Sequence, residues 1–161
     1  MMDTFSLSEV LQMAEEIERN GVRFYKQGAQ AITDPETKKV MLDLAEKEKE
    51  HEKTFAELRR QYCSNEDLNL VDQDGQVAMH IRLMAETHVF NLDHETSQLI
   101  ASVQSPRSLL KLALGFEKDT IVFFSALKEA VKDKNRDKVE MLIQEEVDHI
   151  RQLNQALKQL Q

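Results

Sequence analysis

The chain has 161 residues and a formal net charge of −8 at pH 7, from 21 lysines and arginines against 29 aspartates and glutamates. This length suits a single domain, residues 1–161, and the acidic balance argues against nucleic acid or an anionic membrane surface as a partner. One cysteine, Cys63, excludes a disulfide framework and any Cys-x-x-Cys site. Four glycines and two prolines among many Glu, Lys and Leu residues predict an all-α protein.

The N-terminal segment does not resemble a targeting sequence. Residues 1–6 lack the basic and apolar regions of a signal peptide, and no apolar run approaches the roughly 18 residues that a transmembrane helix needs. Because a lone cysteine is typical of a reducing compartment, we expect a cytoplasmic protein.

Two long helices are predicted in the first part of the chain. Ser6 and Glu9 form a capping box that opens a helix running to about Ala31. The run Thr33-Asp34-Pro35 supplies a turn, an N-cap and a first-turn proline, so a second helix extends from about Pro35 to Tyr62. Residues 7–62 are therefore predicted to form an antiparallel helical hairpin.

A long crossover, residues 63–105, follows the first hairpin. It contains a polar loop, residues 64–75, and a shorter helical candidate over about 76–90. Ser105-Pro106 repeats the cap-plus-proline signal and begins a third helix that runs to about Val131. A turn over 132–135 precedes a fourth helix that ends near Leu160, so residues 106–160 form a second hairpin. We expect the methionines, Met41 and Met141 among them, to fill the core.

The two hairpins are copies of one pattern. Sliding the chain on itself by about 98 or 99 residues aligns Leu11, Ala14, Glu18 and Phe24 with Leu110, Ala113, Glu117 and Phe123, and Leu44, Glu48 and His51 with Leu142, Glu146 and His149. Two copies of a helical hairpin predict a pseudo-twofold four-helix bundle, two antiparallel hairpins joined by the long crossover.

Each long helix has an apolar stripe that a glutamate interrupts, and in two helices a histidine follows three residues later. These polar residues are Glu18, Glu48, His51, Glu117, Glu146 and His149. Glu18 and Glu48 lie equally far from the predicted turn at Thr33, so they face each other, and the second hairpin repeats this relation. Buried carboxylates without partners are costly, so the four glutamates need compensation.

A pair of metal ions is the natural compensation for these carboxylates. One Glu from each of two helices plus Glu-x-x-His from each of the other two is the ligand pattern of a dinuclear carboxylate site in a bundle core. Carboxylates with one imidazole per metal suit ferrous iron or manganese. The competing interpretation is a structural bundle, in which the histidines are satisfied core residues and the glutamates pair with lysines.

Several segments resemble the rubrerythrin group of the ferritin-like superfamily. They are Glu18 followed by Tyr25, and the runs 45–51 (AEKEKEH), 117–121 (EKDTI) and 145–150 (EEVDHI). The resemblance covers residues 7–160 apart from about 64–95. It implies a ferritin-like bundle with two iron ions, for which manganese or zinc are substitutes. It also implies this ligand set: Glu48 and Glu146 bridging, Glu18 and Glu117 terminal, His51 and His149 on one iron each.

The resemblance implies a non-haem di-iron oxidoreductase that reduces hydrogen peroxide or O2. Typical rubrerythrins add a rubredoxin domain with four iron-binding cysteines, whereas this chain has only Cys63. We therefore expect electrons from an external redox protein such as a rubredoxin. Tyr25 is expected to donate a hydrogen bond to a ligand carboxylate from the opposite hairpin, or else to be a core tyrosine.

Two departures from the rubrerythrin pattern keep an alternative open. Thr120 stands where rubrerythrins place an extra glutamate, and the resulting symmetrical ligand set is more like that of bacterioferritin. Phe124 and Ser125 replace an aromatic hydroxyl expected near the second half of the site. The alternative is a ferroxidase or iron-storage protein of the ferritin-like type. The acidic surface is compatible with a homodimer.

Overall fold

The computed structural model describes residues 7–63, 93–103, 105–131 and 133–160. Within these ranges all regular secondary structure is helical. The helices are α1 (Leu7–Ala31), α2 (Pro35–Cys63), α4 (Asp93–Ser102), α5 (Pro106–Ala130) and α6 (Asp133–Gln159). None of them, in the described part of the chain, combines the length and hydropathy needed to cross a membrane.

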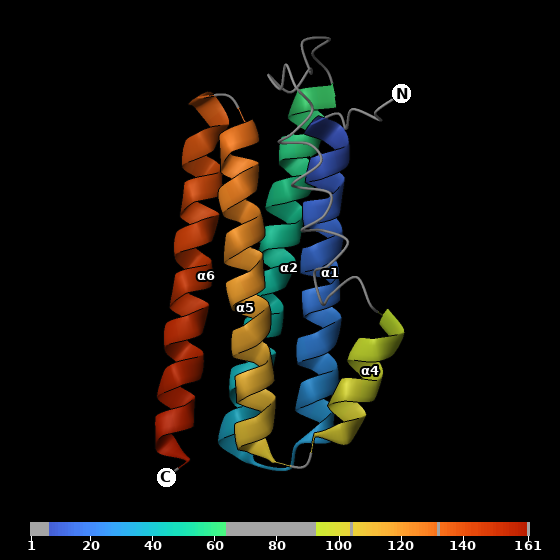
Figure 1. Ribbon diagram of the computed structural model, residues 1–161, viewed down its shortest axis with the longest axis vertical. Coiled ribbons are helices and arrows are strands. Elements are labelled where there is room, and N and C mark those ends of the chain that lie inside the picture. Colours follow the sequence, from blue (N-terminus) through green and yellow to red (C-terminus); the bar gives the residue numbers. More distant parts are fainter. Residues whose placement is uncertain (1–6, 64–92, 104, 132, 161) are drawn as a thin grey trace.

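The four long helices form a bundle of two antiparallel hairpins (Figure 1). Helix α1 packs along α2, α5 packs along α6, and the hairpins meet through α2 with α6 and α1 with α5. Helix α4 lies against α1. Helix α2 ends at the opposite end of the bundle from the start of α5 (Figure 1). The predicted all-α bundle with a long crossover is confirmed.

The helix boundaries follow the local signals of the sequence. The backbone N–H of Thr37 donates to Asp34 Oδ2 at 2.9 Å, and hydrogen bonding with the side chain and backbone of Thr37 lowers the pKa of Asp34. Ser105 caps α5 in the same way, accepting from the Ser108 N–H at 3.1 Å, with Pro106 in the first turn. Both predicted caps are confirmed, whereas the predicted cap at Ser6 and the helical candidate at 76–90 lie outside the described residues.

One helix boundary and one short helix differ from the sequence prediction. Helix α6 begins at Asp133, inside the predicted turn. Helix α4 was not predicted, since its ten residues have no strong apolar stripe, and it buries Ile100.

The core between the helices consists of leucines and phenylalanines on either side of the predicted glutamates. The rings of Phe24 and Phe116 meet edge to face with centroids 4.4 Å apart, and those of Phe55 and Phe124 lie 4.8 Å apart. Met41 is fully buried as predicted, but the prediction for Met141 is wrong, because its side chain is 62% exposed on α6. Burial of each large apolar side chain contributes roughly 1.5–3 kcal/mol to stability.

Candidate metal centre

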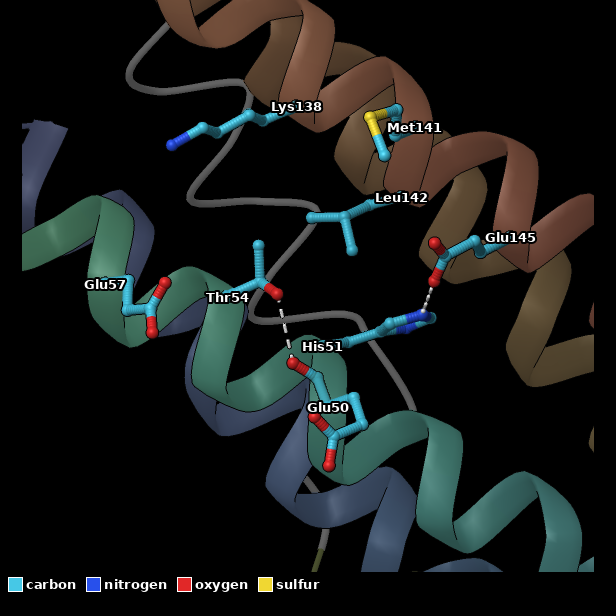
Figure 2. A pocket seen from close by; sticks show the side chains of 8 residues that line it. All are labelled: Glu50, His51, Thr54, Glu57, Lys138, Met141, Leu142 and Glu145. Carbon is cyan, nitrogen blue, oxygen red and sulfur yellow. Dashed lines mark hydrogen bonds and ion pairs between the residues drawn. The ribbon is translucent and has the colours of Figure 1, made fainter.

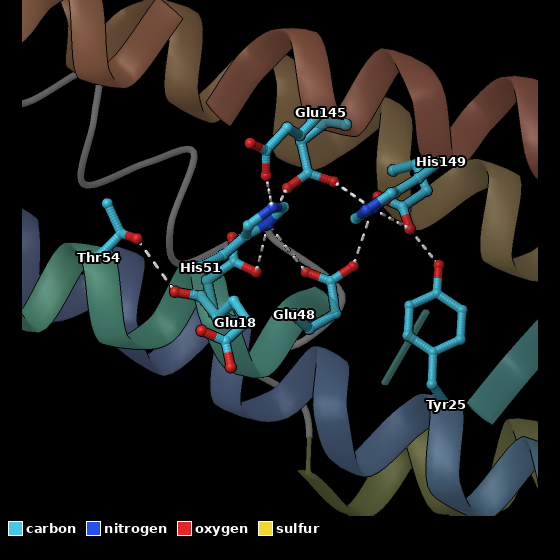
Figure 3. Close-up of polar contacts among 10 residues, drawn as sticks. Glu18, Tyr25, Glu48, His51, Thr54, Glu145 and His149 are labelled. Carbon is cyan, nitrogen blue, oxygen red and sulfur yellow. Dashed lines mark hydrogen bonds and ion pairs between the residues drawn. The ribbon is translucent and has the colours of Figure 1, made fainter. Parts of the chain in front are cut away.

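The structure brings the six predicted ligands together in the interior, each near the middle of its helix. Figure 3 shows four of them, Glu18, Glu48, His51 and His149. We call the six ligands the polar cluster: Glu18 of α1, Glu48 and His51 of α2, Glu117 of α5, and Glu146 and His149 of α6. None of the six is more than 3% exposed. Spacing i, i+3 places each histidine on the same helix face as the glutamate three residues before it.

Two carboxylates occupy the centre of the polar cluster, Glu48 and Glu146, and we call them the central pair. Glu48 directs Oε2 to His51 Nδ1 at 3.5 Å and Oε1 to His149 Nδ1 at 3.1 Å. Glu146 directs Oε1 to His51 Nδ1 at 2.8 Å and Oε2 to His149 Nδ1 at 2.9 Å. Each central carboxylate therefore spans the space between the two imidazoles.

The two remaining carboxylates each approach one histidine. Glu18 Oε2 lies 3.6 Å from His51 Nδ1, and Glu117 Oε1 lies 3.5 Å from His149 Nδ1. We call Glu18 with His51 the His51 half-site, and Glu117 with His149 the His149 half-site. The imidazole rings are stacked, with centroids 5.3 Å apart and planes at 11°. The half-sites thus repeat the twofold relation that the sequence predicts.

Many of the nitrogen and oxygen atoms that could bind a metal in the polar cluster have no hydrogen-bond partner among the described residues. They are Glu18 Oε1, Glu48 Oε1, both oxygens of Glu146, the Nδ1 atoms of both histidines and His149 Nε2. The inward nitrogens and oxygens therefore approach one another without the geometry of a hydrogen bond. Buried polar groups in folded proteins are almost always paired, so such a cluster needs another partner.

The charges of the polar cluster are strongly coupled. Burial raises the pKa of Glu18 and Glu117 well above the usual range, and the negative charge of nearby Glu48 raises both further. Burial also acts against the ionised central pair, but neighbouring polar groups, the two histidines among them, outweigh it and lower the pKa of Glu48 and Glu146. Metal binding to Glu18 and Glu117 therefore competes with protons.

For the two histidines, the surrounding carboxylates affect the pKa more than burial does. Burial lowers their pKa, but the surrounding carboxylates outweigh it, raising the pKa of His51 far above 6.5 and that of His149 from 6.5 to about 12. The raised histidine pKa favours protonated imidazoles, whose positive charge offsets the negative charge of the carboxylates when no metal is bound. Two divalent ions bound to four carboxylates and two neutral imidazoles are neutral, so the residues fit a dinuclear site electrostatically.

Two outer residues contact the polar cluster. Tyr25 Oη donates a hydrogen bond to Glu117 Oε1 across the two hairpins, which is the first of the two alternatives that the sequence left open. The ring of Tyr25 is fully buried, and burial together with the charge of Glu117 raises its pKa. Glu145 was not singled out from the sequence: its Oε2 accepts from His51 Nε2 at 2.6 Å. Its position directly before Glu146 is a signal that could have drawn attention to it.

A surface pocket of about 370 Å³ lies over the outer edge of His51 (Figure 2). Its lining includes Glu50, Glu57, Lys138 and Leu142 as well as His51 and Glu145. Exposed Met141 also lines it. The pocket brings solvent and acidic side chains to one side of an otherwise buried cluster.

The donor set suits first-row divalent metals. Ligand atoms of Glu18, Glu48, His51 and Glu146 lie within 4.8 Å of one another, as do those of the second group, Glu48, Glu117, Glu146 and His149. Carboxylates with one imidazole in each group are typical of iron or manganese sites, and both groups share the central pair. The unpartnered inward atoms are the observation that favours a metal over a purely structural cluster.

Comparisons with known proteins agree with the helical bundle described above. A protein from Thermotoga maritima, described as ferritin-like diiron-carboxylate, matches over 100% of both chains with a TM-score of 0.72 and 21% identity, which establishes the shared fold. No curated protein sequence matches the chain. The sequence model of the rubrerythrin family matches residues 9–98, more than half of the chain. The chain therefore belongs to the rubrerythrin family.

Proposed function

We propose that this chain is a non-haem di-iron oxidoreductase of the rubrerythrin type, which reduces hydrogen peroxide or O2 with electrons from an external redox protein. The observation that carries the proposal is the central pair, in which Glu48 and Glu146 each direct one oxygen to each histidine. Two metal ions that share two carboxylates are suited to a two-electron reaction.

The residues of the polar cluster would have different roles in this reaction. Two bound ferrous ions would supply one electron each, which with two protons converts hydrogen peroxide to two water molecules. Glu18 and Glu117 would each hold one ion from outside the central pair, and His51 and His149 would complete the two positions. Because all six side chains are buried, bulk water is kept away from the reacting atoms.

Tyr25 has a positioning role in this proposal. Its buried hydroxyl holds a proton against Glu117 Oε1, and the raised pKa keeps that proton in place at neutral pH. The contact joins α1 to α5, so it fixes the Glu117 carboxylate from the opposite hairpin. In this proposal the electrons come from an external redox protein such as a rubredoxin, because Cys63 alone cannot form a four-thiolate iron site.

Stopped-flow oxidation of the ferrous-loaded protein tests this function. We expect hydrogen peroxide to oxidise two irons per chain faster than O2 does, and reduced rubredoxin to support repeated turnover. The Glu48→Gln variant should show neither reaction. Slow oxidation by peroxide, or a single turnover with no re-reduction, would contradict the proposal.

One observation favours the ferroxidase or iron-storage alternative. Thr120 is buried three residues after Glu117 and leaves the ligand set symmetrical. This alternative predicts faster oxidation by O2 and accumulation of many more than two irons per chain in a large shell. Light scattering separates such a shell from the homodimer that the proposed function expects.

A further inference from the structure

The two half-sites have matching ligands but differ on the outer side of their imidazoles (Figure 3). His51 Nε2 lies 2.6 Å from Glu145 Oε2. His149 Nε2 is buried and has no hydrogen-bond partner in the part of the chain that the structure describes. Among the described residues, therefore, His51 has a carboxylate behind its imidazole and His149 does not.

The internal repeat shows where this asymmetry arises. The alignment that pairs Glu146 with Glu48 also pairs Glu145 on α6 with Lys47 on α2. An ammonium group cannot accept a hydrogen bond from an imidazole. Lys47 Nζ instead donates to Gln152 Oε1 at 3.1 Å, further along α6. The repeat therefore preserves the ligands and changes the residue behind them.

A carboxylate behind a histidine affects how well the imidazole binds metal. Because an ionised carboxylate only accepts, the Glu145 contact places the proton on His51 Nε2 and leaves the Nδ1 lone pair for a metal. It also fixes the ring orientation and makes the ring a stronger donor. His149 gains none of these effects from the described residues.

The His149 half-site has an outer contact of a different kind. Tyr25 donates to Glu117 Oε1, whereas the residue aligned with Tyr25 is Phe124, which has no hydroxyl. A donor to a ligand carboxylate fixes its position but draws charge away from the oxygen. Glu145 fixes the orientation of the His51 ring and also makes it a stronger metal ligand. The Tyr25 contact therefore does not give the His149 half-site an equal gain in metal affinity.

We propose that Glu145 is a positioning residue that makes the His51 half-site the tighter of the two, so the first divalent ion binds there. This inference rests on the metal-binding part of the proposed function and not on its redox chemistry. The Glu145 side chain is 53% exposed at the rim of the pocket (Figure 2). Because solvent weakens its contact, we expect an effect of about tenfold, the lower end for residues that support a metal ligand.

Titration of the metal-free protein with Co²⁺, followed by visible absorption and calorimetry, tests the order of binding. We expect two steps whose dissociation constants differ by about tenfold. The His149→Ala variant should keep the tight step, and His51→Ala should keep only the weak one. Glu145→Gln should weaken the tight step by about tenfold and leave the other unchanged.

Two further variants control for charge and for symmetry. Glu50→Gln removes the same charge from the same pocket, but the hydrogen bond of Glu50 is to Lys53, so the change keeps the His51–Glu145 contact and should leave both steps unchanged. Lys47→Glu places a carboxylate at the equivalent position behind His149 and should tighten the second step.

Three results would overturn the inference: two equal steps in the wild type, the same isotherm for Glu145→Gln and Glu50→Gln, or a tight step that survives in His51→Ala. Two equal steps would leave the dinuclear site of the proposed function intact. A wild-type protein that binds no Co²⁺ would defeat the proposed function itself.

Discussion

The interior of the bundle contains two chemically different regions. Along the helices on either side of the middle, leucines and phenylalanines such as Leu11, Phe24 and Phe55 are fully buried and pack against one another. In the middle, the polar cluster is equally buried, but many of its donor atoms have no partner among the described residues. The apolar regions contribute the free energy of folding, whereas the polar cluster costs free energy unless a ligand occupies it.

This difference separates fold from function in one continuous core. Changes in the polar cluster should destroy metal binding and leave the helices folded. Changes in the apolar regions should lower the free energy of unfolding, and the folded variants should still bind metal. If both kinds of change affected stability alone, the polar cluster would be a structural feature with no binding role.

The largest effect is expected from the central pair. Glu48→Gln keeps the volume of the side chain but removes a charged ligand that faces both histidines. We expect metal affinity to fall by more than a hundredfold, beyond the range of roughly 10–100-fold for residues outside the ligand set. Isothermal calorimetry measures this loss, with circular dichroism to show an intact fold. Glu46→Gln, an exposed position on the same helix, is the matched control and should bind normally.

Phe24→Ala is the corresponding change in the apolar region. Phe24 is fully buried and packs edge to face against Phe116 and Tyr25. Its removal should lower the free energy of unfolding by about 3–5 kcal/mol. Denaturant unfolding of the metal-free protein measures this, and Val122→Ala, at an exposed position on α5, should change stability little. If the folded Phe24→Ala variant no longer binds two ions, the separation of the regions fails.

The pH dependence of stability should reverse when metal binds. In the metal-free protein the pKa values of His51, His149, Glu18 and Glu117 are raised. The stabilisation from a raised pKa is complete below the unfolded value, 6.5 for histidine, and is lost as pH rises toward the folded value, about 12 for His149. The melting temperature of the metal-free protein should therefore fall between pH 6.5 and 8.5, for example in a calorimetric scan.

With Mn²⁺ bound, the same groups must be deprotonated, so higher pH strengthens binding and raises the melting temperature. Parallel slopes for the metal-free and loaded proteins would argue against ligation by these residues.

A smaller effect is expected from Tyr25→Phe. The variant keeps the buried ring but removes the hydrogen bond to Glu117. We expect a loss of about 1 kcal/mol in the stability of the metal-free protein and a smaller change in metal affinity than Glu145→Gln produces. Denaturant unfolding and Co²⁺ titration measure the two quantities. An unchanged stability would show that the Glu117 carboxyl is satisfied without the phenol.

Much of the fold could be predicted because its signals are local. The caps at Asp34 and Ser105 and the apolar stripes depend on residues within one or two turns of each other. The meeting of Glu18 with Glu48 follows from their equal distance to a short turn, so the hairpin fixes it without knowledge of the rest of the bundle. The internal repeat then placed the second hairpin in the same register.

The features that sequence reasoning missed depend on how one hairpin packs against the other. The Glu145 contact with His51 requires the rotation of α6 relative to α2, which no short-range pattern encodes. The exposure of Met141 has the same origin, because a methionine at the edge of an apolar stripe can face either way. Helix α4 depends on its contact with α1, since its own sequence is only weakly amphipathic.

The most direct test of the account is the number of metal ions that the wild-type chain binds. The metal-free protein would be titrated anaerobically with Fe²⁺, freed of excess metal, and analysed for metal and protein. The account predicts two ions per wild-type chain and none retained by Glu48→Gln. Fewer than one ion per wild-type chain, or equal retention by the variant, would contradict the assignment of the polar cluster as a metal centre.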